Sequence, residues 1–478
     1  MTGRRVAIIG GGVIGGGWAA RFLLNGWDVR VFDPDPEAER RIGEVLANAR
    51  RALPGLYDRG LPGEGRLSFH FTLAEAVAGA DWVQESVTER LELKHAVLAD
   101  VLAHAPGDAV IGSSTSGFKP SDLNREGARV IVAHPFNPVY LLPLVELVGD
   151  GAETERAAAT LSGIGMYPLT LRKEIDAHIA DRFLEAVWRE ALWLVKDGVA
   201  TTADIDEAIR MGFGLRWAQM GLFETYRVAG GEAGMRHFMA QFGPALTWPW
   251  TRLTDVPEFD AALVELIAGQ SDAQSGHMDI RALERLRDDN LVAILRGLKR
   301  TGSGAGGVIA AHEAILPLPE AGPDGLPVTA QLQVPTSYVD YNGHMNEAPY
   351  MEVAARASDR VMEVIGADAA YIAEGLSYFT AENHLRYLAE IDIGATITVT
   401  TQALGGDGRK LHLFHRFWTG GKTPAATVET LMLHVDLSTR RVVPPAPQVA
   451  EAAARMVALH AGHPRPDRLV MNRPKPGA

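Results

Sequence analysis

The sequence predicts three structural parts: a mostly parallel α/β domain, a helical domain, and an α+β domain with an antiparallel sheet. Apolar strand-like runs alternate with helical patterns from Arg4 to about residue 171, and long amphipathic helical runs follow to about residue 312. After a proline-rich stretch, further strand-like runs accompany one substantial helix. With 478 residues, 47% of them hydrophobic, the chain is long enough to bury several cores.

The first strand leads into a glycine turn, in the run VAIIGGGVIGGG. Gly10, Gly12 and Gly15 have the spacing Gly-x-Gly-x-x-Gly between a buried-type strand and a helix. That spacing allows a tight turn, close approach of the backbone to a pyrophosphate, and tight packing of a helix whose N-terminus faces the phosphates. We therefore expect a Rossmann domain that binds a dinucleotide, with Val13 and Ile14 at the same turn.

The second strand, DVRVFD, ends in Asp33. An acidic residue roughly 20 positions past such a turn accepts hydrogen bonds from a ribose and repels a 2′-phosphate. We therefore predict that the cofactor is NAD rather than NADP.

Apolar patterns and the positions of glycine and proline also predict the later strands, helices and domain limits. DWVQES, AVIGSS and VIVAHP have strand character, while FLEAVWREALWLVKDG has helical periodicity that ends at Gly198. The run LPLPEAGPDGLP has four prolines in twelve positions and predicts a linker. The predicted parts are an NAD-binding domain (1–180), a helical substrate and dimerisation domain (181–315), a linker (316–329), an α+β domain (330–455) and a tail (456–478).

Charge and composition limit the classes of partner that this protein is expected to bind. The formal net charge is −13, and no basic run of the kind that binds nucleic acid or anionic lipid is present in the sequence. The chain has no cysteine, which excludes disulfides and thiolate chemistry, and we expect no metal. The first strand accounts for the apolar N-terminal run, and no other stretch approaches the about 20 apolar residues of a membrane span. We expect a soluble, cytoplasmic protein that acts on small molecules.

His134 and Glu146 stand twelve positions apart in AHPFNPVYLLPLVELV. A hydride leaves a carbinol carbon only as the hydroxyl proton is removed, so a dehydrogenase needs a base, and a histidine held by a carboxylate is suitable. The intervening prolines predict a loop that returns the chain and lets the two side chains meet. In isolation, the pair could also be a structural histidine and a surface glutamate.

The run SSTSGF followed by AHPFNPVYLLPLVELV resembles the 3-hydroxyacyl-CoA dehydrogenase family, over about the first 300 residues. The resemblance implies that Ser116 hydrogen-bonds the reacting oxygen, that His134 is the base supported by Glu146, and that Asn137 shapes the site. Phe118 is assigned to the substrate pocket. Glu89 and Lys94 align with cofactor-proximal positions of the family, although a solvated helix start would also explain them.

Within that family, LVELV, KEID, LVKDGVATTADID and GLRWAQMGLFET are similar to the lambda-crystallin and gulonate dehydrogenase branch, which handles free small hydroxy acids. The sequence departs from the wider family at HIADRF, where Asp181 replaces a usual asparagine, and here it resembles the carnitine dehydrogenases. A carboxylate near the substrate costs desolvation free energy unless a cation such as a trimethylammonium group pairs with it. Arg182 is the alternative partner.

Aromatic side chains are concentrated in the helical domain, and aromatic faces bind quaternary ammonium groups. Trp188 and Trp193 cannot share one helical face, so we expect at most one of them in the pocket, and Trp188 is assigned to it. Most of the others are expected in the core. The five tryptophans of this region, out of nine, are Trp188, Trp193, Trp217, Trp248 and Trp250.

The run VPTSYVDYNGHMNEAPYMEVAARASDRV resembles the start of hotdog-fold acyl-CoA thioesterases of the 4-hydroxybenzoyl-CoA type. The resemblance implies that Asp340 is a nucleophile or a base for water, while amides at a helix N-terminus polarise the thioester carbonyl. A polar turn is the alternative. Thr336 and Ser337 stand where the family commonly has a tryptophan and an earlier aspartate. The other residues assigned to this site are Gly343, His344, Asn346 and, more weakly, Glu352.

The similarity to fused carnitine dehydrogenases implies a bifunctional enzyme. It would oxidise L-carnitine to 3-dehydrocarnitine with NAD and hydrolyse betainyl-CoA to glycine betaine and CoA. Both folds commonly pair, so a homodimer is expected by analogy. The alternative is a dehydrogenase for another free 3-hydroxy acid, such as gulonate, with a hotdog unit that serves only dimerisation.

Overall fold

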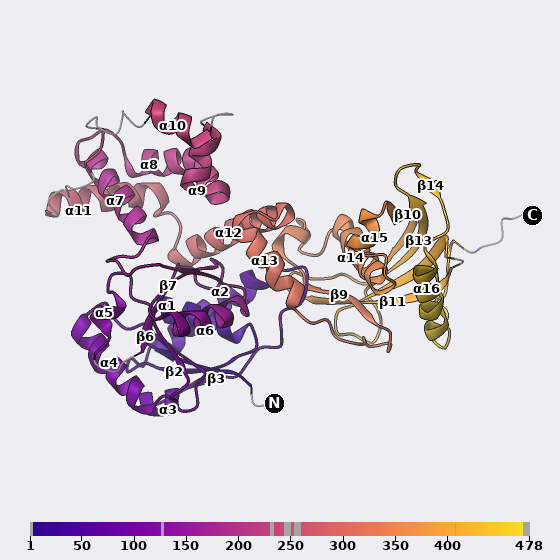
Figure 1. The fold of residues 1–478 in the computed structure, drawn as a ribbon, viewed down its shortest axis with the longest axis horizontal. Coiled ribbons are helices and arrows are strands. Elements are labelled where there is room, and N and C mark those ends of the chain that lie inside the picture. The colour runs from indigo at the N-terminus through magenta and orange to yellow at the C-terminus, as the bar shows by residue number, and fades with distance from the viewer. Residues whose placement is uncertain are drawn as a thin grey trace, which may run out of the picture. The chain divides into compact units, whose positions relative to one another are not determined.

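The computed structural model describes residues 3–125, 129–229, 234–242, 250–252, 260–406 and 408–471. The chain forms two compact units, and Figure 1 labels most of their helices and many of their strands. The first contains Met1–Leu53 and Gly63–Ala314, and the second contains Pro54–Pro62 and Ile315–Ala478.

The first unit is built on an eight-stranded sheet with the order β3-β2-β1-β4-β5-β6-β7-β8. All neighbouring strands are parallel except β6 and β7. Strand β4 is fully buried and β1 is almost fully buried, as expected where helices cover both faces. The predicted Rossmann fold is confirmed. The strands are β1 (Arg5–Ile9), β2 (Asp28–Phe32), β3 (Leu67–Phe69), β4 (Trp82–Glu85), β5 (Val110–Ser113), β6 (Val130–Pro135), β7 (Leu144–Val148) and β8 (Tyr167–Thr170).

Three of these strands, β3, β7 and β8, were not predicted individually. β3 is short and only half-buried, β7 is an apolar run interrupted by Glu146, and β8 is an edge strand that contains Pro168. The helices around the sheet are α1 (Val13–Leu23), α2 (Ala38–Ala52), α3 (Leu73–Val77), α4 (Leu91–His104), α5 (Pro120–Leu123) and α6 (Gly151–Ser162).

A helical region completes the first unit, as predicted. Its long helix α12 is capped at the N-terminus by Asp279, whose carboxylate accepts the amide of Ala282 at 2.7 Å, and at the C-terminus by Gly302 in the left-handed conformation. The region contains α7 (Ala180–Lys196), α8 (Thr202–Ala208), the π-helical turn η2 (Ile209–Phe213), α9 (Gly214–Ala229), α10 (Gly234–Phe242), α11 (Ala261–Ser275), α12 (Ile280–Thr301) and α13 (Gly304–Ile315).

The second unit has an antiparallel sheet with the order β10-β13-β12-β11-β9, to which β14 adds beside β13. The long helix α14 buries Val353, Ala354 and Ala357 in one core with strand residues such as Ile397 and Phe417. This is the hotdog arrangement that the sequence predicts. Its elements are β9 (Val328–Gln333), η5 (Thr336–Tyr338), α14 (Glu347–Val364), α15 (Ala369–Ala373), β10 (Leu376–Tyr387), β11 (Thr396–Gly406), β12 (Lys410–Trp418), β13 (Ala426–Asp436), β14 (Arg441–Val442) and α16 (Pro447–His460).

The ends of this unit differ from the predicted limits. Helix α16 continues past residue 455, because Ala453 and His460 are buried and Nδ1 of His460 accepts the amide of Ala403 at 3.0 Å. Farther along the predicted tail, the amides of Val470 and Met471 donate to the buried carboxylate of Glu429. Residues 54–62 also belong to this unit, which the sequence did not predict.

Among the described residues, no helix is both long and apolar enough to cross a membrane.

Candidate active sites

The glycine turn of the first unit has the geometry of a dinucleotide cradle. Gly10 has a φ of +103°, and a Cβ atom on Gly15 would lie 1.9 Å from the carbonyl oxygen of Gly10. Glycine is therefore required at both positions. Gly12 caps the N-terminus of α1 with open space around it, and Val13 and Ile14 begin that helix with accessible side chains.

Asp33 lies beside this turn, as predicted. Its carboxylate accepts the amide of Gly11 at 2.5 Å and that of Asp35 at 2.8 Å. A cavity of about 420 Å³ is lined by Gly10, Gly12 and Asp33, and also by Arg41, which pairs with Asp35 at 2.8 Å. A glycine cradle next to a carboxylate fits the pyrophosphate and ribose of NAD.

Lys94 is buried between two carboxylates. Only 1% of its surface is exposed, and its Nζ lies 2.9 Å from Glu85 and 3.2 Å from Glu89. Glu89 also accepts hydrogen bonds from the hydroxyl of Thr115 and the amide of Gly117. Burial tends to raise the pKa of Glu89, but the Thr115 hydrogen bond and Lys94 outweigh it, so the pKa is lowered. The alternative of a solvated helix start is wrong for Lys94.

His134 and Glu146 face each other in register on the antiparallel strands β6 and β7. Nδ1 of His134 lies 3.1 Å from Oε2 of Glu146, whose other oxygen accepts the amides of Ile179 at 2.9 Å and Ala180 at 3.0 Å. Burial tends to raise the pKa of Glu146, but the hydrogen bonds from His134 and the two amides lower it below its usual range. Glu146 is fully buried, so the alternative of a surface glutamate is wrong.

Asp181 lies on the opposite side of the imidazole, in the first turn of α7. Its Oδ2 is 3.6 Å from Nε2 of His134, whereas no ion pair with Arg182 is present in the described part of the chain. Burial is the largest cause that raises the pKa of Asp181. His134 is therefore placed between two carboxylates, one at each ring nitrogen.

The remaining predicted residues of this site are more accessible. Ser116 follows β5 and is exposed, Asn137 is exposed just after β6, and Phe118 is half-buried. Phe136, which the sequence did not single out, packs edge-on against the imidazole of His134 with ring centres 4.9 Å apart.

The tryptophans require a correction. We expected most of them in the core, but Trp188 is 54% exposed and Trp217 and Trp250 are exposed as well. Trp193 is partly covered, and two cations lie over its ring. Nζ of Lys196 is 4.9 Å from the ring centre, and Cζ of Arg252 is 4.6 Å from it. Trp248 lies outside the described residues. The reason is that helical apolar faces in this region remain uncovered within the single chain.

Sequence reasoning missed His178. It is fully buried, its ring centre lies 5.5 Å from that of His134, and its Nε2 is 3.2 Å from the carbonyl oxygen of Thr115. The HIADRF motif contains this residue, but nothing in the sequence alone shows that its side chain turns inward.

The second predicted site lies in the loop before α14. The amide of Gly343, which has a φ of +87°, donates to the carbonyl of Asp340 at 3.0 Å, and the Asp340 carboxylate accepts the amide of Asn342 at 2.8 Å. Asn346 caps α14 through the amide of Glu347 at 2.6 Å, and His344 lies 3.3 Å from Glu390. The loop is thus a well-formed turn that leaves a half-buried carboxylate beside a helix N-terminus.

Glu352 is not joined to this loop by its described contacts. It pairs instead with Arg356 at 2.5 Å, one turn along α14. Arg356 also contacts Asp58 at 2.5 Å and the hydroxyl of Tyr338 at 3.2 Å. These contacts explain why residues 54–62 belong to the hotdog unit.

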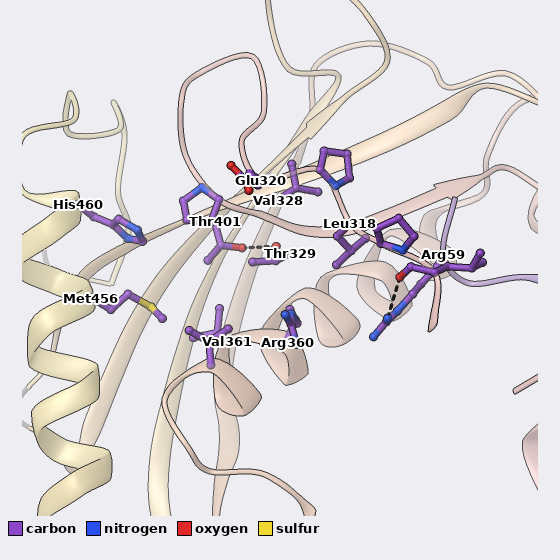
Figure 2. A pocket seen from close by; sticks show the side chains of 15 residues that line it. Arg59, Leu318, Glu320, Val328, Thr329, Arg360, Val361, Thr401, Met456 and His460 are labelled. Atoms are coloured by element: carbon purple, nitrogen blue, oxygen red, sulfur yellow. Dashed lines mark hydrogen bonds between the residues drawn. The ribbon is translucent and has the colours of Figure 1, made fainter. Parts of the chain in front are cut away.

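A cavity of about 380 Å³ opens elsewhere in the second unit (Figure 2). Figure 2 shows His460 and Met456 extending from α16 toward Thr401 and Val361, and a hydrogen bond of 2.7 Å joins Thr329 to Thr401. Asp340 does not line this cavity. The sequence did not predict it.

Comparisons with known proteins define the class of each part. Residues 5–174 match the NAD-binding domain of 3-hydroxyacyl-CoA dehydrogenase, residues 178–256 match its C-terminal domain, and residues 334–453 match the thioesterase-like superfamily. A solved structure of 5-formyl-3-hydroxy-2-methylpyridine 4-carboxylic acid 5-dehydrogenase, an NAD+-dependent dismutase, is 25% identical with a TM-score of 0.53. It covers 62% of this chain, and the match spans 98% of that chain. The protein therefore combines an NAD-dependent dehydrogenase of this class with a thioesterase-like hotdog unit, and the predicted NAD cofactor is confirmed.

Two kinds of relatives identify the family more closely. The L-carnitine dehydrogenase/betainyl-CoA thioesterase of Ruegeria pomeroyi is 63% identical over 476 residues, which cover 96% of this chain and 97% of the relative. The L-carnitine dehydrogenase of Mesorhizobium japonicum is 60% identical over 311 residues, which cover 63% of this chain and 85% of the relative. The chain belongs to the family of fused L-carnitine dehydrogenase/betainyl-CoA thioesterases.

Proposed function

We propose that the first unit oxidises L-carnitine to 3-dehydrocarnitine with NAD, and that the second hydrolyses betainyl-CoA to glycine betaine and CoA. Family membership supports both activities. The observation that carries the choice of carnitine is the position of Asp181, 3.6 Å from Nε2 of His134.

That position suits the shape of the substrate. The quaternary nitrogen of carnitine is only three bonds from the hydroxyl oxygen, so a hydroxyl at Nε2 of His134 places the cation near Asp181. The Asp181 carboxylate, whose pKa is raised mainly by burial, gains a partner when the ammonium group arrives. Gulonate has a carboxylate like that of carnitine but only neutral hydroxyl groups beyond its reacting carbon, so it would leave the Asp181 carboxylate without a cationic partner.

The protein side of the oxidation follows from the hydrogen bonds of His134. Because the Glu146 carboxylate can only accept, Nδ1 of His134 carries a hydrogen and Nε2 is the basic nitrogen. His134 takes the hydroxyl proton at Nε2 while the hydride leaves the carbinol carbon, and Glu146 stabilises the imidazolium that forms. Ser116 hydrogen-bonds the reacting oxygen, and Asn137, Phe118 and Trp188 shape the pocket.

The NAD-binding residues are Gly10, Gly12 and Gly15 for the pyrophosphate and Asp33 for the ribose, with Val13, Ile14, Glu89 and Lys94 nearby. NAD, when bound, supplies the acceptor for the hydride. The hydrogen bond from Thr115 and the ion pair with Lys94 keep Glu89 ionised, and they fix the segment that carries Thr115.

In the second unit, Asp340 acts either as the nucleophile or as the base that activates water. Water adds to the thioester carbonyl, the C–S bond breaks, and the products are the free acid and the CoA thiol. Amides at the N-terminus of α14, held by the Asn346 cap, polarise the carbonyl. Gly343 permits the turn, His344 borders it, and Glu352 acts only through Arg356.

The assembly and location are also proposals. Exposed apolar side chains on α7 and α9, including Phe183, Trp188, Leu215 and Phe223, favour a homodimer that covers them. The need for NAD favours the cytoplasm.

Two assays test these activities. NADH formation is measured with L-carnitine, D-carnitine, L-gulonate and 3-hydroxybutyryl-CoA presented separately, and turnover of L-carnitine alone is expected. Turnover of gulonate or of the CoA ester instead would contradict the carnitine assignment. Release of CoA thiol from betainyl-CoA is measured in the same preparation, and its absence would favour a hotdog unit that serves only dimerisation.

A further inference from the structure

Two consecutive residues before α7 have an unusual backbone. Ala177 has a φ of +59° and His178 a φ of +49°, and neither is glycine. The left-handed region costs free energy for residues that carry a Cβ atom, so the surrounding contacts must hold it. This conformation turns His178 inward, where it is fully buried.

The contacts of these residues lie on both sides of Ser116. The amide of Ala177 donates to the carbonyl of Gly117 at 3.2 Å, and Nε2 of His178 lies 3.2 Å from the carbonyl oxygen of Thr115. Because a carbonyl can only accept, Nε2 carries the hydrogen. The segment that bears Ser116 is therefore held by one backbone donor and one side-chain donor.

The next two residues hold the other half of the site. The amides of Ile179 and Ala180 both donate to Glu146, and Asp181 follows directly. Residues 177–180 thus connect Ser116, the His134–Glu146 pair and Asp181. Within this connection, His178 provides the side-chain hydrogen bond.

A purely space-filling role does not account for a histidine here. No described residue offers a hydrogen-bond partner to Nδ1 of His178, and a buried polar atom without a partner is unfavourable. An apolar side chain would avoid that loss but would also remove the bond to Thr115. Burial lowers the pKa of His178, which keeps the ring neutral near the site proposed for the ammonium group.

We propose that His178 is a positioning residue of the dehydrogenase reaction, which fastens the Ser116 segment to the segment that bears Asp181 through its hydrogen bond to the Thr115 carbonyl. This inference rests on the proposed function of the first unit. The residue acts through Ser116 and Asp181 rather than by contact with the reacting atoms.

The test compares His178→Gln with His178→Met in the full-length protein. The two side chains have similar length, but only glutamine can donate to the Thr115 carbonyl from a position near that of Nε2. We expect His178→Met to lower kcat for L-carnitine by roughly 10- to 100-fold while the Kd for NADH changes by less than about twofold. His178→Gln should recover most of that loss. The isotope effect on kcat with C3-deuterated carnitine should rise in the methionine variant only, because misplacement slows the chemical step.

Three results would overturn the proposal: wild-type kcat in the methionine variant, equal losses in both variants, or a loss confined to thermal stability with an unchanged isotope effect. If methionine prevents folding, His178→Asn replaces it, because asparagine is too short to reach Thr115. The proposed function is tested separately by the wild-type enzyme. If that enzyme oxidises a 3-hydroxy acid other than carnitine, the contrast between the variants is measured on that acid.

Discussion

Nδ1 of His134 lies 3.1 Å from Oε2 of Glu146, and the two residues are direct partners on adjacent antiparallel strands. Strand pairing therefore fixes the imidazole more firmly than a flexible loop would. With Nδ1 committed to Glu146, the basic Nε2 is directed at Asp181 and the space beside it.

The first prediction concerns His134. His134→Gln should lower kcat for carnitine oxidation by about 10³-fold or more, since a glutamine amide cannot take the hydroxyl proton. The Kd for NADH, measured by fluorescence titration, should stay within about twofold because the base acts on the substrate. An equal loss of NADH affinity would contradict this assignment.

Glu146→Gln tests whether the Glu146 carboxylate supports His134 as the base. We expect kcat to fall by roughly 10²- to 10⁴-fold, as when a histidine loses the carboxylate that sets its tautomer. Because the pKa of Glu146 is lower in the folded protein than its ordinary value of 4.5, the ionised carboxylate stabilises the fold above that pH. The stability gap between wild type and the variant, from thermal unfolding, should therefore close as the pH falls below 4.5. A gap that is independent of pH would count against this.

Asp181→Asn should raise the stability of the fold at neutral pH, whereas Glu146→Gln should lower it. The pKa of Asp181 is raised above 3.8, mainly by burial, so its ionisation disfavours the fold once the pH exceeds that value. The asparagine variant should unfold at a slightly higher temperature than wild type at neutral pH, and the difference should shrink in acid. A less stable variant at neutral pH would mean that Asp181 is structurally paired rather than held for a ligand.

Asp33 should decide the choice between NAD and NADP. Asp33→Asn should raise the KM for NAD and reduce the preference for NAD over NADP by about tenfold, because the repulsion of a 2′-phosphate is lost. Asp35→Asn is the matched control, since it frees Arg41 while Asp33 stays in place. Unchanged preference in the Asp33 variant would place the ribose elsewhere.

Asp340→Ala should separate the two activities. CoA release from betainyl-CoA is expected to fall by at least about 10²-fold, while NADH formation from carnitine stays at the wild-type level. Asn342→Ala removes the side-chain amide that donates to the Asp340 carboxylate at 3.4 Å, but it keeps the backbone amide that donates at 2.8 Å, so it should have a smaller effect. Full thioesterase activity in the alanine variant would leave Asp340 with only its role in the turn.

Much of this architecture could be predicted because it depends on local patterns. The glycine spacing, the buried strand before it and Asp33 are close in sequence, and the hotdog helix and strands have clear apolar periodicity. The meeting of His134 with Glu146 was predicted from the prolines between them, but the strand β7 that carries Glu146 was not, because a carboxylate interrupts its apolar run. The inward turn of His178 depends on two left-handed residues that are not glycine, and the pairing of Asp58 with Arg356 joins residues far apart in the sequence.

The central claim is that Asp181 recognises a cation beside Nε2 of His134. This is the nitrogen that takes the hydroxyl proton of the substrate. The most direct test compares kcat/KM for L-carnitine with that for 3-hydroxy-5,5-dimethylhexanoate, in which carbon replaces the quaternary nitrogen, in wild type and in Asp181→Asn. We expect wild type to prefer carnitine by about 10²-fold, and the variant to lose most of that preference through its KM for carnitine. A preference that survives unchanged in the variant would contradict the account.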